Sequence, residues 1–201
     1  MNDFERIFMC DFLQLIHVPD NIFTEALVWT ILIPLLVIAA GNIIRAFNSM
    51  ITTGLSRVIG AGPAFVVRNY VTYPGTIHHE FAHALLATVT GAKVTSITLV
   101  PRGQTLGQVE FIPRGNIFLR SLQLSISAVA PVICGGISLS LMYMFLWQKL
   151  TEWWHYPLFI YFFVSILFHM TMSTHDLKNF VKGLIPSLIV IYIITLAVLA
   201  F

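Results

Sequence analysis

The chain has 201 residues, of which 57% are hydrophobic and only 10% are charged. A soluble globular protein has about 25% charged residues, so this composition indicates a membrane protein. The formal net charge is only +2, and no basic run or basic–aromatic stripe points to a nucleic-acid partner. The two cysteines, Cys10 and Cys134, predict neither a disulfide framework nor a cysteine metal site.

Residues 1–21 predict an N-terminal amphipathic segment that lies at the membrane interface. Phe4, Phe8 and Phe12 recur at helical spacing, and the polar residues lie mostly on the opposite face. An ordinary N-terminal helix that packs on the bundle fits the same pattern equally well. A cleavable signal peptide fits poorly, because acidic residues outnumber the single Arg6 before the first apolar run.

The first apolar run covers residues 26–44 and carries no charge, which is enough to span a bilayer. Residues 45–73 mix Arg45, Arg57 and Arg68 with apolar residues and helix-breaking glycines. They predict either an amphipathic helix followed by a loop or a short membrane segment, and both alternatives stay open.

The most informative motif is HExxH, formed by His79, Glu80 and His83. Pro74 and Gly91 bracket a predicted helix of about 17 residues around it. Residues four apart share a helical face, so His79 and His83 can present two imidazoles to one metal ion. Zn²⁺ suits such ligands and keeps an open position. Glu80, one step round the helix, is the predicted general base acting on a zinc-activated water.

After this helix the periodicity changes. Residues 94–100 and part of 106–112 are rich in β-branched residues, with Pro101, Gly103 and Gly107 between them. This pattern predicts a β-hairpin, which either serves the function or is a plain structural connector.

Three further apolar segments follow, at residues 122–147, 157–172 and 184–201. Small residues in the first favour close helix packing, and Trp147, Trp153 and Trp154 are typical of an interfacial aromatic belt. We therefore expect a mainly α, polytopic membrane helix bundle of about 4–5 membrane helices, with a β-hairpin after the HExxH helix. If Lys93, Arg102, Arg114, Arg120, Lys178 and Lys182 are all cytoplasmic, the 122–147 segment runs outward, the 157–176 segment returns, and Asp176 and the HExxH helix end on the same side. The positive-inside rule supports this topology, because Lys149 is the single basic residue of the intervening loop.

A catalytic zinc site needs a third protein ligand, and Asp176 is the residue we favour. It follows the 157–172 segment, where a free carboxylate would be costly. On one continuous helix His169 would lie two turns earlier, too far away to bind the same ion. His169 and Ser173 are therefore expected to support the ligands or contact substrate.

Each of these residues also has a simpler interpretation. Asp176 could pair with Lys178 or cap a helix terminus, and His169 could be a hydrogen-bonded core histidine. His78 and His175 lie off the metal-binding faces, and Glu110 is expected to be a solvated residue of the hairpin.

In its HExxH motif and in the order of its predicted elements, the chain resembles the site-2 protease family of intramembrane zinc metalloproteases. The likeness covers roughly residues 70–180 and rests on the stretches PGTIHHEFAHALLATVTGAKV and FHMTMSTHDLKN. These also resemble a small branch of the family without a PDZ domain. The resemblance implies that Asp176 completes the zinc site and that the hairpin dips into the membrane. It also implies one metalloprotease-like domain over residues 22–201.

The expected function is hydrolysis of peptide bonds in membrane-protein or membrane-anchored substrates. The protein would be a multi-pass integral protein of a prokaryotic cell membrane, in contact with the lipid bilayer. The oligomeric state is left open. Rival functions are a zinc hydrolase acting on something other than protein and a catalytically silent metal-binding protein. A haem protein is disfavoured, because His79 and His83 share a face and cannot ligate opposite sides of one haem.

Overall fold

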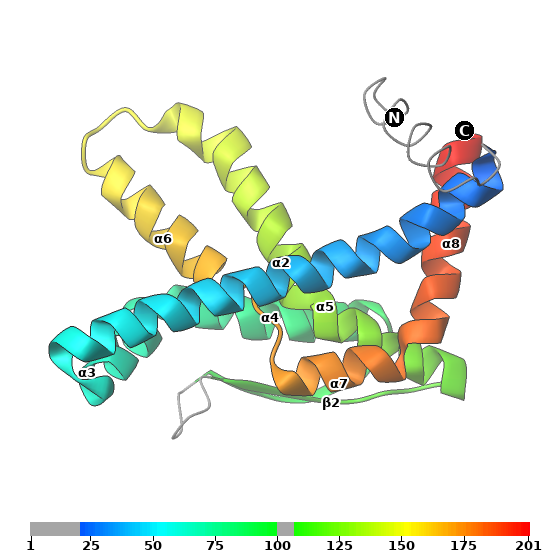
Figure 1. Cartoon of the computed structure of the whole chain (residues 1–201), viewed down its shortest axis with the longest axis horizontal. Helices are drawn as coiled ribbons and strands as arrows, with labels where there is room; N and C mark the ends of the chain where they lie inside the picture. The colour runs from blue at the N-terminus through cyan, green and yellow to red at the C-terminus, as the bar shows by residue number, and fades with distance from the viewer. Residues whose placement is uncertain (1–20, 100–106) are drawn as a thin grey trace. The chain divides into compact units, whose positions relative to one another are not determined.

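The computed structural model describes residues 21–99 and 107–201, and 80% of these residues are helical (Figure 1). The predicted interfacial segment, except for residue 21, and the predicted turn of the hairpin lie outside the described residues. The described elements are α2 (Ile22–Ile59), α3 (Ala61–Val66), the π-helical turn η1 (Val67–Val71), α4 (Tyr73–Val89), β1 (Lys93–Thr98), β2 (Gln108–Ile112), α5 (Ile117–Leu141), the short turns η2 (Met142–Leu146) and η3 (Trp147–Lys149), α6 (His155–His169), α7 (Thr174–Lys182) and α8 (Leu184–Ala200).

Two of the described helical stretches are long and apolar enough to cross a membrane. They are Ile22–Ile59 and Ile117–Lys149. The pair α6 and α7 passes the same test as one span, although it bends by 58° at its break. Among the described helices, α8 is apolar but shorter, and α4 is not a candidate span. Two stretches able to span a membrane are consistent with the expected membrane protein, whereas the finer count of 4–5 spans stays a prediction.

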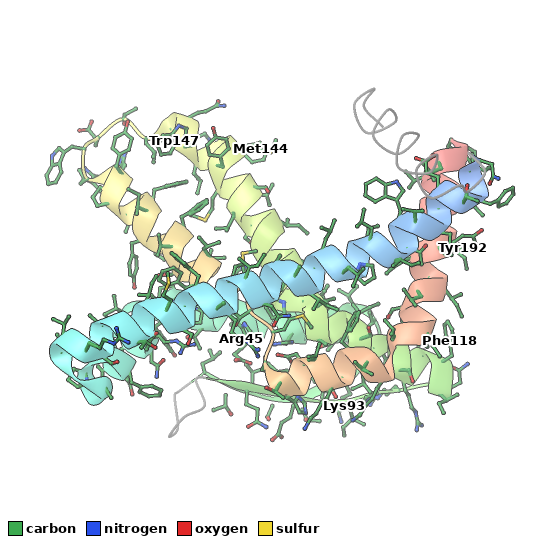
Figure 2. The ribbon with its side chains drawn as sticks, viewed as in Figure 1. Arg45, Lys93, Phe118, Met144, Trp147 and Tyr192 are labelled. Carbon is green, nitrogen blue, oxygen red and sulfur yellow. The ribbon has the colours of Figure 1, made fainter. Side chains whose placement is uncertain are left out.

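The exposed surface has the character expected of a lipid-facing bundle. Large apolar side chains such as Ile43, Val58, Met144 and Trp147 are between 44% and 82% exposed. Figure 2 shows Met144 and Trp147 projecting outward near the end of the α5–η3 helix. Such exposed apolar side chains on both stretches are consistent with a surface that faces lipid.

The chain divides into two compact units, and α2 belongs to both. In the described residues, the smaller unit combines 21–36 with 185–201. There the Asn21 side chain caps α2, accepting hydrogen bonds from the backbone of Phe23 and Thr24, and Thr195 Oγ1 donates to Ala26 O at 3.4 Å. The larger unit, residues 37–184, contains every predicted site residue.

Within the larger unit, α4 packs against α5, α6 and both strands, and α7 packs on α5. Two glycines allow the closest helix contacts: a Cβ on Gly75 would lie 1.9 Å from Ser165 O, and one on Gly183 would lie 2.0 Å from Ser121 O. A buried apolar cluster joins α5 to α7 and the stretch before it. Its members are Ala128, Val129, Val132, Met172 and Phe180.

The predicted β-hairpin is confirmed. β1 and β2 pair antiparallel, with Lys93 opposite Ile112 and Thr98 opposite Gln108. Its base is tied to the helices by the fully buried Gln123 of α5. The Gln123 amide accepts from Arg114 N at 2.8 Å and donates to Thr90 O at 2.9 Å, so one side chain joins the end of α4, the hairpin exit and α5.

One expectation about the later segment is wrong. Asp176 does not continue the helix that holds His169, because α6 ends at His169 and α7 begins at Thr174. The physical reason is a capping box: Ser173 Oγ accepts from Asp176 N at 3.1 Å, and Ser173 N donates to Asp176 Oδ2 at 2.8 Å. This reciprocal pair starts a new helix and turns the chain.

Candidate metal centre

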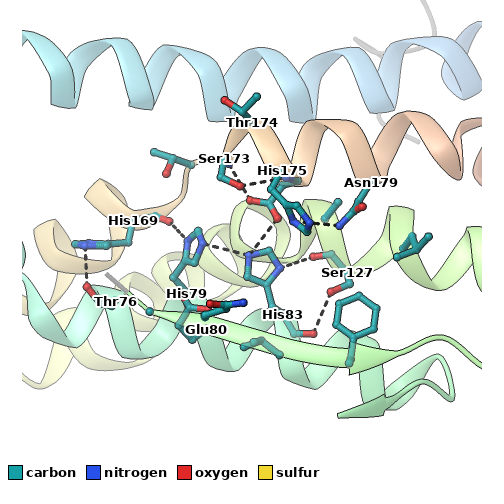
Figure 3. Close-up of a pocket in the computed structure, with 18 of the residues that line it drawn as sticks. Thr76, His79, Glu80, His83, Ser127, His169, Ser173, Thr174, His175 and Asn179 are labelled. Carbon is teal, nitrogen blue, oxygen red and sulfur yellow. Dashed lines mark hydrogen bonds and ion pairs between the residues drawn. The ribbon is translucent and has the colours of Figure 1, made fainter. Parts of the chain in front are cut away.

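The HExxH residues lie on α4, as the motif predicts. Thr72 precedes the helix and Pro74 occupies its first turn, where a missing N–H costs no helical hydrogen bond. Because the two histidines are four residues apart, their rings lie one above the other on one face. Their Nε2 atoms are 3.2 Å apart, and the rings point toward each other in Figure 3.

Asp176 reaches the same point from α7. Its Oδ1 lies 3.7 Å from His83 Nε2, whereas its Oδ2 is held by the backbone of Ser173. One ligand atom from each of His79, His83 and Asp176 lies within 4.8 Å of the others. Asp176 therefore takes part in the capping box of α7, one of its simpler interpretations, and also faces the imidazole pair.

The hydrogen bonds behind the imidazoles fix which nitrogen faces the centre. His79 Nδ1 lies 2.6 Å from His169 O, and His83 Nδ1 lies 2.7 Å from Ser127 O. A carbonyl oxygen only accepts, so each Nδ1 carries the hydrogen. Burial, and secondly the nearby charge of His83, lowers the pKa of His79 to about 3, which keeps that imidazole neutral.

Each neutral ring then directs an Nε2 lone pair at the other ring. Two acceptors 3.2 Å apart cannot form a hydrogen bond with each other, and His83 is only 8% exposed. A cation between the two nitrogens resolves this conflict. Metal-bound histidines are oriented in this way, with the other ring nitrogen donating to a carbonyl or carboxylate.

All three candidate ligand atoms lie within 4.8 Å of one another, and two of their separations can be compared with those around a small tetrahedral ion. Zn–N bonds of about 2.0–2.1 Å at tetrahedral angles put neighbouring ligand atoms about 3.3 Å apart. The Nε2–Nε2 separation of 3.2 Å and the His83 Nε2–Asp176 Oδ1 separation of 3.7 Å lie close to that value. Two imidazole nitrogens and one carboxylate oxygen leave a fourth position open. These three side chains could therefore hold a metal ion.

Glu80 lies beside this cluster and is only 6% exposed. Burial, and to a smaller extent the carboxylate of Asp176, raises the pKa of Glu80 to about 7. A carboxyl group with a pKa near neutrality can accept a proton and return it, which suits general acid–base chemistry. A Cβ on Gly107 would lie 2.6 Å from Glu80 Cγ, so the start of β2 packs directly on the Glu80 side chain.

The cluster opens into a cavity of about 640 Å³. Its walls come from η1, α4, β2, α5, α6, α7 and the stretch between α6 and α7. A volume of this size is typical of small-molecule and substrate sites. The residues that line the cavity include Arg68, His79, Glu80, His83, Gly107, Ser127, His169, Ser173, His175, Asp176 and Asn179.

The structure places His169 and Ser173 next to the ligands. The carbonyl oxygen of His169 accepts from His79, while its imidazole pairs with Thr76 Oγ1 at 3.1 Å and with Ser165 O at 2.9 Å. The ring of His169 is thus hydrogen-bonded in the interior, and its backbone orients a ligand. Ser173 holds Asp176 by the capping box.

The remaining histidines near the motif behave differently from the ligands. His78 turns away from the cluster and pairs with Ser138 Oγ at 2.9 Å. His175 lines the cavity, where its Nδ1 lies 3.3 Å from Asn179 Nδ2. Glu110 is exposed on the hairpin, where its carboxylate accepts from Ser96.

Sequence reasoning missed Ser127, Gly107 and Asn179. Ser127 acts through its backbone carbonyl, so no residue type signals its role. Gly107 is a glycine directly before a strand, which often marks a close approach of the backbone, and that signal was available. Asn179 lies one turn after His175 on α7, a spacing at which two side chains meet.

Comparisons with known proteins add no relative: no family model matches the chain, and neither a curated protein nor a solved structure matches it.

Proposed function

We propose that the protein is a membrane-embedded zinc metalloprotease, similar in mechanism to the site-2 protease family. The observation that carries the proposal is the convergence of two lone pairs and a carboxylate oxygen on one point, with Glu80 beside them in a cavity. A protein built only to store a metal ion would need neither the cavity nor the adjacent unliganded carboxyl group.

His79, His83 and Asp176 would hold the ion, which when bound supplies a Lewis acid and lowers the pKa of water to about 7. Glu80 takes the proton of the attacking water and returns it to the leaving amine. The backbone carbonyls of His169 and Ser127 keep both imidazoles in the ligating tautomer.

The hairpin offers a way to present the peptide. A helical substrate must be extended before its backbone can be attacked, and β2 is an edge strand of a two-stranded sheet. Gln108, Val109 and Phe111 of β2 also line the cavity. An extended substrate that pairs with β2 would therefore run along the wall that carries Glu80.

The test compares wild type with Glu80→Gln and with Glu110→Gln, the same substitution at an exposed carboxylate. Each protein is purified in detergent, its metal content is measured, and it is incubated with a library of membrane-spanning peptides. Mass spectrometry then identifies new peptide termini. We expect zinc near one per chain in all three proteins, and cleavage by all except Glu80→Gln.

Metal binding is tested separately with His79→Ala/His83→Ala, which should lose the ion, and His78→Ala, which should keep it. Full zinc occupancy without cleavage of any peptide would contradict the protease proposal and favour a silent metal-binding protein. Hydrolysis of a non-peptide ester or amide by wild type, without cleavage of any peptide, would favour a different zinc hydrolase.

A further inference from the structure

The cavity beside the candidate metal centre contains one ionised side chain that the proposed chemistry does not use. Arg68 lies on the π-helical turn η1, just before α4, and lines the cavity together with Phe168 and His169. Single π-helical turns are uncommon and occur often at functional sites.

Arg68 has no carboxylate partner within the described part of the chain, where the one recorded ion pair joins His83 to Asp176. The residue is exposed and is among those that line the cavity. A guanidinium presents five donors in a fixed fork and matches a carboxylate in two hydrogen bonds. It is therefore an available anion-binding group inside a substrate-sized cavity.

The charge balance of the cavity favours an anion at this place. The acidic side chains that line the cavity are those of Glu80 and Asp176. A bound dication would neutralise both carboxylates, and the imidazole ligands are neutral. The charge that remains is the single positive charge of Arg68, so a substrate with one negative group near the cleaved bond complements the cavity.

We propose that Arg68 is a specificity-determining residue that binds the carboxylate of a Glu or Asp side chain in the substrate, at a fixed distance from the cleaved peptide bond. This inference rests on the proposed protease function and names its substrate class. The carboxylate belongs to the peptide because Arg68 shares one cavity with the metal-ligand cluster. A cation that served only to anchor the protein to lipid headgroups would not need that position.

The experiment uses Leu/Ala-rich membrane peptides in which one Glu, Gln or Lys is moved through successive positions around a fixed cleavable stretch. Wild type should cleave the best Glu peptide with a kcat/KM about tenfold higher than that of the matching Gln peptide, mainly through a lower KM. The reason is that the Gln peptide lacks the charge-assisted hydrogen bonds between the substrate carboxylate and Arg68. Arg68→Gln should abolish this preference, and Arg68→Glu should transfer it to the Lys peptide. Arg57→Gln, a substitution outside the cavity, should leave it unchanged.

A charge swap separates recognition from a structural role, since a structural defect would slow all three peptides alike and lower metal content. Wild type that does not distinguish Glu from Gln at any position, or an Arg68→Glu variant without preference for Lys, would overturn the inference. If the effect of the Arg68 substitutions depends on whether the lipid is anionic or neutral, and is the same for all three peptides, Arg68 binds lipid headgroups. That result would also overturn the inference.

Equilibrium binding of the same peptides to the Glu80→Gln protein gives a readout that does not depend on turnover. If wild type cleaves nothing but the Glu peptide binds about tenfold more tightly than the Gln peptide, the protease function fails and the recognition by Arg68 stands. If cleavage is observed and binding is indifferent to charge, the recognition fails and the protease function stands.

Discussion

At the scale of single residues, the candidate centre depends on groups that stand behind the ligands. Each imidazole is oriented by a backbone carbonyl, and the carboxylate of Asp176 is oriented by the backbone N–H of Ser173. Such outer contacts usually change metal affinity by about 10- to 100-fold when they are removed. The ligands are thus held by main-chain atoms of α5, of the end of α6 and of the start of α7.

Ser173→Ala should weaken metal binding by up to about tenfold: it keeps the backbone N–H that holds Asp176 Oδ2 but removes the Oγ acceptor of Asp176 N, which loosens the first turn of α7 that carries Asp176. It should also cost about 1 kcal/mol of stability through the lost helix cap. Asn116→Ala is a matched control, since it removes the N-cap of α5, where Asn116 accepts from Leu119 N, without touching a ligand.

Zinc competition with a chromophoric chelator measures the affinity, and thermal unfolding in detergent measures the stability. Equal metal affinity in Ser173→Ala and wild type would show that the capping box does not orient the ligand.

Gly107→Ala should impair catalysis and leave the metal bound. A methyl group at this position would lie 2.6 Å from Glu80 Cγ and 2.8 Å from Glu80 Oε1, so either the carboxylate or the start of β2 must shift. We expect a fall in kcat of about tenfold or more, since general-base efficiency depends on position. Gly54→Ala, which meets no atom within 4 Å, is the control.

The measurements are peptide cleavage kinetics and metal content for both glycine variants. Unchanged kcat in Gly107→Ala would mean that the hairpin does not constrain Glu80.

At the scale of elements, Gln123 is the main polar tie between the hairpin and the helices. It is fully buried and bonds to the backbone of Thr90 and Arg114. Gln123→Met keeps the volume and removes all three hydrogen bonds, which takes these partners away from the backbone groups of Thr90 and Arg114. We expect a loss of about 2–4 kcal/mol and earlier proteolysis within residues 93–112.

Gln148→Met is the matched control, because Gln148 is exposed at the end of the α5–η3 helix. Thermal unfolding and limited proteolysis in detergent compare the two variants with wild type. A hairpin equally resistant in both variants would contradict this role of Gln123.

Most elements of the larger unit could be predicted from the sequence, because their signals are local. Pro74 and Gly91 bracket α4, and β-branched residues mark the two strands. The break between α6 and α7 was missed because a long apolar run suggests one helix. The Ser173–Asp176 spacing of a capping box was the signal that could have revealed it.

For the site, the sequence indicated the two histidines through helical periodicity, and Asp176 by elimination among the remaining polar residues. The support from Ser127 O and His169 O could not be predicted, since backbone carbonyls look alike in every residue type. The approach of Gly107 to Glu80 and the place of Arg68 on the cavity wall depend on tertiary packing between distant segments, which no local pattern encodes.

At the scale of the whole molecule, the α5–η3 helix gives a prediction about topology. If Ile117–Lys149 crosses the membrane once, the residues before it and the loop after it lie on opposite sides. Lys and Arg are concentrated before α5 and in α7, whereas Lys149 is the single Lys or Arg of residues 122–173. The positive-inside rule therefore puts the hairpin base in the cytoplasm.

The test introduces single cysteines by Arg114→Cys and Glu152→Cys after replacement of Cys10 and Cys134 by Ala. A membrane-impermeant maleimide should label position 152 on intact cells and position 114 only after permeabilisation. Labelling of both positions in detergent controls for reactivity. Labelling of both from the same side would contradict a single crossing.

The capping box has a consequence for ion choice. Because Oδ2 of Asp176 accepts a hydrogen bond in the capping box, Oδ1 is the oxygen that faces the imidazoles, and the carboxylate would act as a monodentate donor to a bound ion. Calcium prefers six to eight oxygen donors at about 2.3–2.6 Å, and magnesium demands an octahedron rich in oxygen. A nitrogen-rich, three-donor pocket of this kind should discriminate against both ions, however abundant they are in the cell.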